Sequence, residues 1–139
     1  MATRTGVGFD FVLGPLENEL MEAAWALGRW ASVGDVLEQR ERTGGAPATY
    51  STIKNVMANL HDKGHLRKRP AGKQNEFIPA VSRDEFARRA VGRVVDPLLR
   101  NHRNPLFAHI VDGLLEDDQA IAEFEALIAE RRKAKAKAR

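Results

Sequence analysis

The sequence predicts a mainly α-helical protein that carries one small β-hairpin. Two observations predict this class. Apolar residues recur every three or four positions through most of the chain, and only residues 65–79 contain two short extended pieces around a glycine-containing turn. The chain has 139 residues, of which 43% are hydrophobic and 29% are charged, so it is globular and holds one domain or two small ones.

The first helix is predicted to begin at Gly14 and Pro15 and to end near Leu27. Proline at the first helical position loses no useful N–H, so this dipeptide suits a helix start. The short segment 30–33 favours an edge strand, and a second helix is expected after it, ending at about Arg42.

A third helix is predicted between Thr49, a suitable N-cap, and Gly64, a suitable stop. The turn 43–47, rich in helix-stopping residues, separates it from the second helix. Its apolar residues fall at i, i+3, i+4 and i+7 and predict one buried stripe: Ile53, Val56, Met57 and Leu60. The opposite side begins with short polar groups and one cation, unlike the Glu/Lys mixture of an ordinary solvated helix: Ser51, Thr52, Lys54 and Asn55.

Two short extended pieces, 65–70 and 76–79, flank the basic turn 71–75 and predict a hairpin. The order helix, strand, helix, helix, hairpin is that of a winged helix-turn-helix, which we expect over residues 13–81. Residues 1–12 are expected to form an N-terminal tail.

The remaining third of the chain is predicted to be helical. Ser82 can cap one helix, which Pro97 kinks or breaks, Asn104–Pro105 starts a second, and Asp117–Asp118 starts a third. Three short helices cannot bury all their apolar residues among themselves, so we expect 82–130 to be a dimerisation region. The residues assigned to the dimer contact are Val91, Val94, Val95, Leu98, Ile110, Leu114, Phe124 and Leu127.

The net charge of +3 is unevenly distributed. Residues 46–73 carry six cations and one acid, residues 81–130 carry six cations and ten acids, and the basic tail 131–139 carries six cations and no acid. Positive charge in one middle segment and one tail indicates contact with a polyanion there, and a solvated charged surface is the alternative.

The sequence shows no catalytic constellation: GxSxG, a P-loop and HExxH are all missing. His61 and His65 are four residues apart, but Gly64 ends the helix between them, so we expect no metal and no cofactor. The absence of cysteine excludes disulfides and thiolate sites. No apolar run reaches membrane-spanning length, and the start MATRTGVGFDF lacks the core of a signal peptide. We therefore expect a cytoplasmic protein with no membrane partner.

The polar side of the third helix favours contact with DNA. Short side chains let the backbone approach the major groove, where asparagine can pair with adenine, a threonine methyl can meet thymine, and lysine reaches phosphate or guanine. The N–H groups of the first turn, with Thr49 and Tyr50, suit a phosphate. An ordinary polar helix face is the alternative, and the basic hairpin that follows makes it less favoured.

Four motifs also resemble those of a known family: Leu13-x-x-x-Glu17-x-x-Leu20-Met21-x-x-x-Trp25, Val33-x-Asp35-Val36-Leu37, Tyr50-Ser51-Thr52-Ile53 and Leu60-x-x-Lys63-Gly64-x-Leu66. They are similar to motifs of the penicillinase/methicillin-resistance repressors (BlaI/MecI), with the copper repressor CopY as a related member. The resemblance implies a homodimeric winged-helix repressor whose partner is a double-stranded DNA operator with dyad symmetry. A winged-helix module that binds protein instead of DNA is the alternative function.

In that family the equivalent helix reads the major groove and the wing lies against the DNA backbone. The predicted DNA-binding residues are therefore Thr49, Tyr50, Ser51, Thr52, Lys54 and Asn55 on helix 49–63, with Arg67, Arg69 and Lys73 in the wing 67–75. Copper-responsive members bind metal through cysteine pairs, which this chain lacks. The β-lactam-responsive members are cut at an Asn-Phe bond where this chain has His109-Ile110, so the sequence leaves open whether a regulatory protease or a ligand inactivates it.

Overall fold

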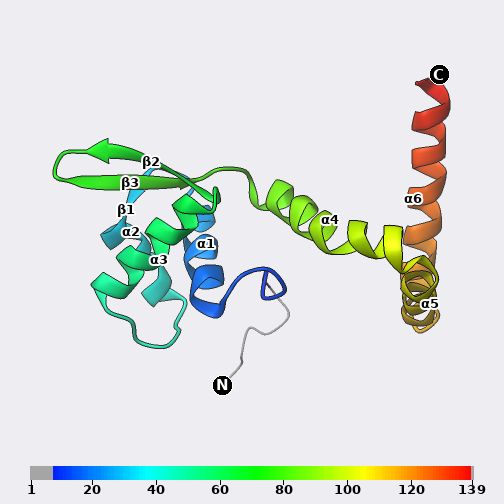
Figure 1. Cartoon of the computed structure of the whole chain (residues 1–139), viewed down its shortest axis with the longest axis horizontal. Coiled ribbons are helices and arrows are strands. Elements are labelled where there is room, and N and C mark those ends of the chain that lie inside the picture. The colour runs from blue at the N-terminus through cyan, green and yellow to red at the C-terminus, as the bar shows by residue number, and fades with distance from the viewer. Residues whose placement is uncertain (1–7, 139) are drawn as a thin grey trace. The chain divides into compact units, whose positions relative to one another are not determined.

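The computed structural model describes residues 8–138. These residues form two compact units that meet in sequence between Val91 and Gly92, and each unit is described separately. The mainly α class with a small β-wing is confirmed. The elements are α1 (Pro15–Leu27), β1 (Ala31–Ser32), α2 (Val33–Arg42), α3 (Tyr50–Asp62), β2 (Leu66–Ala71), β3 (Gln74–Pro79), α4 (Arg83–Asn101), α5 (Arg103–Leu114) and α6 (Asp118–Lys137) (Figure 1).

The core of the first unit lies between α1, α2, α3 and the sheet. Of the stripe predicted for α3, Ile53, Met57 and Leu60 are completely buried, and Val56 is half-buried. They pack with the buried residues of α1 and α2, chiefly Leu20, Met21 and Val36. Burial of this stripe turns the opposite, polar side of α3 toward solvent.

Local capping explains where the helices begin. Gly14 is the N-cap of α1, Pro15 is its first residue, and the Gly14 N–H donates to Glu17 Oε1 at 3.0 Å. Ser32 and Asp35 cap α2 reciprocally, each side chain accepting from the other residue's N–H at 3.1 Å. The Ser32 N–H is also the main reason that the pKa of Asp35 is lowered.

The sheet is antiparallel with strand order β1-β3-β2. Gly72, at φ +67°, occupies the turn between β2 and β3, where a left-handed conformation favours glycine. In the register, Ala31 and Lys68 both lie opposite Phe77, and Arg69 lies opposite Glu76. The hairpin β2–β3 projects beyond the helices of this unit as a wing (Figure 1).

The structure differs from the predicted tail 1–12, of which residues 8–12 are described. Phe9 is 4% exposed, and its ring lies 4.8 Å from that of Phe86 and 5.5 Å from that of Trp25. The Phe9 N–H donates to Oδ1 of the buried Asn18 at 2.8 Å. The segment before α1 is therefore part of the core, because burial of an aromatic side chain stabilises the folded state. No local sequence pattern reveals this burial.

The first unit also extends past the predicted boundary at residue 81. Ser82 caps α4 as predicted, with the Glu85 N–H donating to its hydroxyl at 3.1 Å. The first turns of α4 then bury Phe86 and Ala90 in the core of the first unit. This packing places the boundary inside α4.

The second unit, described over residues 92–138, consists of the rest of α4 with α5 and α6. The predicted kink or break at Pro97 did not end the helix, since α4 continues through this proline. Asp117 caps α6, its Oδ1 accepting from the Gln119 and Ala120 N–H groups. The described part of the basic tail is helical because α6 continues to Lys137. Within the described part of α5 and α6, no residue is buried.

Candidate nucleic-acid interface

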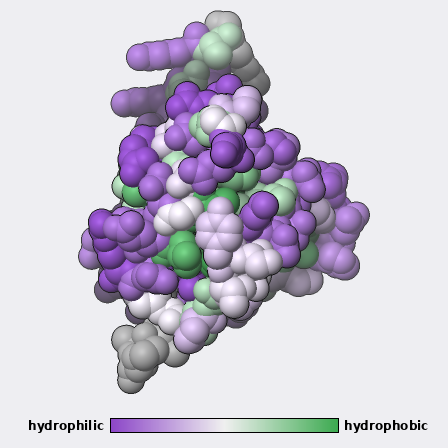
Figure 2. Space-filling model, turned by 90° about the vertical axis from the view of Figure 1, so that its left-hand side faces the viewer, coloured by the Kyte–Doolittle hydropathy of each residue, from purple (hydrophilic) through white to green (hydrophobic). Residues whose placement is uncertain are grey.

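The polar side of α3 is exposed as predicted. Ser51, Lys54 and Asn55 lie on it in one line with Ala58, whose small side chain leaves the helix backbone accessible. Figure 2 looks onto the side of the first unit that carries α3 and the tip of the hairpin, and this side is largely hydrophilic with a limited apolar area. The exposed side thus combines short polar groups with one long cation.

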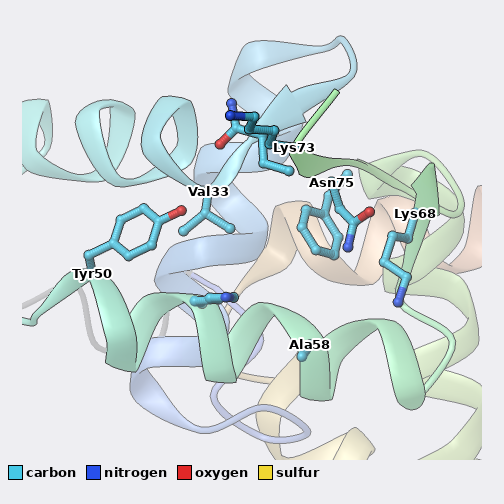
Figure 3. Close-up of a pocket in the computed structure, with 9 residues that line it drawn as sticks. Val33, Tyr50, Ala58, Lys68, Lys73 and Asn75 are labelled. Carbon is cyan, nitrogen blue, oxygen red and sulfur yellow. The ribbon is translucent and has the colours of Figure 1, made fainter. Parts of the chain in front are cut away.

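A groove of about 250 Å³ lies between α3 and the hairpin (Figure 3). It is lined by Val33, Tyr50, Lys54, Ala58, Lys68, Lys73, Gln74, Asn75 and Phe77. Val33 and Phe77 are buried apolar residues of this lining, whereas its three lysines come from α3, β2 and the turn of the hairpin. Positive charge from three separate segments therefore meets around one groove.

The two sides of the hairpin carry different cations. Leu66 is buried and Lys68 follows two residues later, so both lie on the side that meets α3. In Figure 3 the side chain of Lys68 points from β2 toward α3. Lys68 lies within the wing 67–75 expected from the sequence, but it was not among the residues predicted for the site.

Arg67 and Arg69 lie on the other side of the hairpin, near Trp30. The Arg69 guanidinium is 4.5 Å from the centroid of the Trp30 ring, and that of Arg67 is 6.0 Å away. Arg69 also donates to Glu76 Oε1 through Nε at 3.0 Å and through Nη2 at 2.8 Å. The structure therefore brings Lys73 together with Lys54 but places the two predicted arginines away from the groove.

The first turn of α3 is organised by Thr49. Its hydroxyl oxygen accepts from the Thr52 N–H at 3.2 Å and lies 3.0 Å from the Thr52 hydroxyl. Tyr50 is 47% exposed and lines the groove. Thr49 and Tyr50, the two residues of the predicted phosphate contact, are thus at the surface. The hydroxyl of Thr49 already has a hydrogen-bond partner in Thr52.

The last turn of α3 is connected to α1 by an ion pair. Lys63 Nζ lies 2.7 Å from Glu17 Oε2. The hydrogen bond from Lys63, followed by that from the Gly14 N–H, lowers the pKa of Glu17. The carboxylate therefore remains charged and holds the end of α3 against the first turn of α1.

Comparison with models of protein families shows which family the chain belongs to. The model of the penicillinase repressor matches residues 13–130, which include the whole hairpin and most of the helical region after it. The chain belongs to the penicillinase repressor family. The resemblance in the four sequence motifs is thereby confirmed. A comparison with curated proteins found no match.

Membership of the penicillinase repressor family makes the chain a member of a family of DNA-binding transcriptional repressors, not of a family of enzymes. Among residues 8–138, no three His, Cys, Asp or Glu side chains come close enough to hold a metal ion. No helix in the same residues combines the length and apolar composition that crossing a membrane requires.

Proposed function

We propose that this chain is a homodimeric repressor that binds a dyad-symmetric operator with α3 in the major groove. The observation that carries the proposal is the groove between α3 and the hairpin. Lys54, Lys68 and Lys73 surround it, next to the exposed polar side of α3. A DNA duplex presents base edges to a helix in its groove and phosphates to the cations beside it, which suits this arrangement.

The proposed contacts divide into two kinds. Ser51, Thr52 and Asn55 lie near the N-terminus of α3, the part of a recognition helix that approaches base edges. The lysines of the hairpin are proposed to contact phosphates, with Arg67 and Arg69 as secondary contacts from the outer side. Lys54 can serve either purpose because its side chain is long.

The homodimer is proposed from the second unit and the adjoining turn of α4. Among the predicted dimer residues, Val91, Val94, Phe124 and Leu127 are between 42% and 51% exposed. Val95, Leu98, Ile110 and Leu114 are half-buried. Further exposed apolar residues accompany them: Phe107, Val111, Leu115 and Ile128. Apolar surface of this extent is typical of an interface, and a second copy would supply the two half-site contacts of a dyad operator.

Selection of bound fragments from genomic DNA tests the proposed function. The wild-type chain should recover a limited set of fragments that share one sequence with dyad symmetry. Its affinity for a duplex of that sequence should fall steeply as salt is added, because binding to phosphates releases counterions. Recovery of random fragments would contradict operator recognition. If the chain instead binds a protein with an affinity that does not change with salt, the alternative function as a protein-interaction module is favoured.

A further inference from the structure

Arg40, in the last turn of α2, is a buried cation. Its side chain is 4% exposed, and among the described residues no other charged side chain is buried. Its Nε donates to Glu19 Oε2 at 3.0 Å, and its Nη2 lies 2.9 Å from the same oxygen. Nη2 also donates to the carbonyl of Ala46 at 2.6 Å. One guanidinium thus joins α1, α2 and the loop that leads to α3.

The loop is shaped around this guanidinium. The N–H and the hydroxyl of Thr43 both donate to the Arg40 carbonyl, at 3.1 and 2.9 Å. Gly45 has φ +125°, and a Cβ placed there would lie 3.0 Å from Glu19 Oε1 and 3.1 Å from Arg40 Nη2. The backbone therefore passes close over the ion pair, in a conformation that favours glycine.

The N-terminal turn of α3 depends on this loop for its position. Ile53, Met57 and Leu60 hold the rest of the helix in the core, but Tyr50, Ser51 and Thr52 are exposed. The Ala46 carbonyl that Arg40 holds lies just before Ala48, which packs partly against the core, and Thr49, the N-cap. A shift of the loop would therefore displace the side chains that approach DNA first.

We propose that Arg40 is a positioning residue for operator recognition, and this inference rests on the proposed DNA-binding role of α3. Arg40 sets the path by which the chain enters α3 and does not contact DNA itself. A buried ion pair usually adds little net stability compared with apolar side chains of similar size. The planar guanidinium of arginine, however, can bind a carboxylate and a carbonyl at once in a fixed geometry, which the ammonium group of lysine cannot do.

The test compares Arg40→Lys with Arg42→Lys. Arg42 is the matched control, because it is exposed and pairs with Glu38 within α2. Each variant and the wild type are titrated against the duplex that the wild type selects and against a scrambled duplex, over a range of salt concentrations. Thermal melting followed by circular dichroism establishes that each variant is folded at the assay temperature.

Arg40→Lys should bind the selected duplex about 10-fold more weakly and the scrambled duplex less than about 2-fold more weakly, because base contacts are misplaced while phosphate contacts persist. Its salt slope should equal that of the wild type, and Arg42→Lys should match the wild type on both duplexes. Equal losses on both duplexes, which a direct phosphate contact by Arg40 would give, would overturn the proposal. No loss on either duplex would overturn it as well.

Glu19→Gln is the second variant, for the case in which Arg40→Lys is not folded. It preserves the shape of the side chain but removes the charge that pairs with Arg40. The same selective loss of affinity for the selected duplex is therefore expected. If Glu19→Gln is folded and binds both duplexes like the wild type, the proposal is wrong. A wild type that prefers no genomic sequence would instead refute the proposed function.

Discussion

Glu17 and Lys63 connect the first turn of α1 to the end of α3 through a contact of 2.7 Å. They are 46 residues apart in sequence. Glu17 also accepts from the Gly14 N–H, so a single carboxylate caps α1 and holds the end of the proposed recognition helix. The pKa of Glu17 lies below its ordinary value of 4.5 for these reasons, with the Lys63 bond as the larger cause.

This pair should make stability depend on pH. A lowered pKa in the folded state means that the contribution is fully present above pH 4.5 and is lost as the pH falls below it, toward the folded-state pKa. Glu17→Gln should lower the free energy of unfolding at pH 7 by at most about 1 kcal/mol, because Lys63 is largely exposed. At pH 3 the difference should be smaller. Urea denaturation at both pH values measures it.

Glutamine still fits the cap at Gly14, so this variant isolates the contact with Lys63. Glu41→Gln, which removes the charge of an exposed glutamate of α2, is the matched control. The prediction is wrong if Glu17→Gln costs as much at pH 3 as at pH 7.

Sequence choice should depend on Asn55 more than on Thr52, whose hydroxyl already contacts Thr49. Asn55 is exposed and is not needed by the core, so Asn55→Ala should leave the thermal midpoint nearly unchanged. Affinity for the selected operator should fall by about 1–3 kcal/mol, with much less change on a scrambled duplex. Asn59→Ala, one turn further from the N-terminus, is the matched control. Equal losses on both duplexes would reduce Asn55 to a backbone contact.

The two sides of the hairpin should differ in their effect on the salt dependence of binding. Lys68→Ala together with Lys73→Ala should weaken binding to all sequences alike and reduce the salt slope by roughly two, one for each phosphate that is no longer neutralised. Arg67→Ala together with Arg69→Ala removes the same charge from the outer side and should reduce the slope less. Titrations at several salt concentrations measure both slopes. If the arginine pair has the larger effect, the outer side of the wing faces DNA.

The first unit should fold without the second when the chain ends at Val91. Residues 1–91 retain Phe86 and Ala90, which are buried in the first unit, and lack most of the proposed dimer contact. They should be a folded monomer that binds operator much more weakly, because two linked half-site contacts multiply affinity. Light scattering and thermal melting measure the two properties. A dimer as stable as that of the full chain would contradict the proposed interface.

Ending the chain at Ala80 provides the comparison. This fragment lacks Phe86, whose ring contacts those of Phe9 and Trp25. It should therefore melt at a lower temperature than residues 1–91, because removal of a buried aromatic side chain costs roughly 3–5 kcal/mol. Equal melting temperatures would show that α4 does not belong to the first unit.

The helix starts and the exposed side of α3 could be predicted without the structure. The starts at Gly14, Ser82 and Asp117 depend on residues within a few positions of one another, so a local pattern predicts them. The buried stripe of α3 follows from periodicity alone, and with it the side of the helix that faces solvent. Both are consequences of local backbone geometry.

The choice of cations around the groove, in contrast, depends on tertiary packing. Alternation along β2 shows that Arg67 and Arg69 lie on one side and Lys68 on the other, but not which side meets α3. Burial of Leu66 and Phe77 in the core settles that choice. In the same way, the sequence around Phe9 and Arg40 does not distinguish them from exposed aromatic and basic residues. Only packing against distant segments buries them. Such contacts form between segments far apart in sequence, and a pattern read within one segment does not contain them.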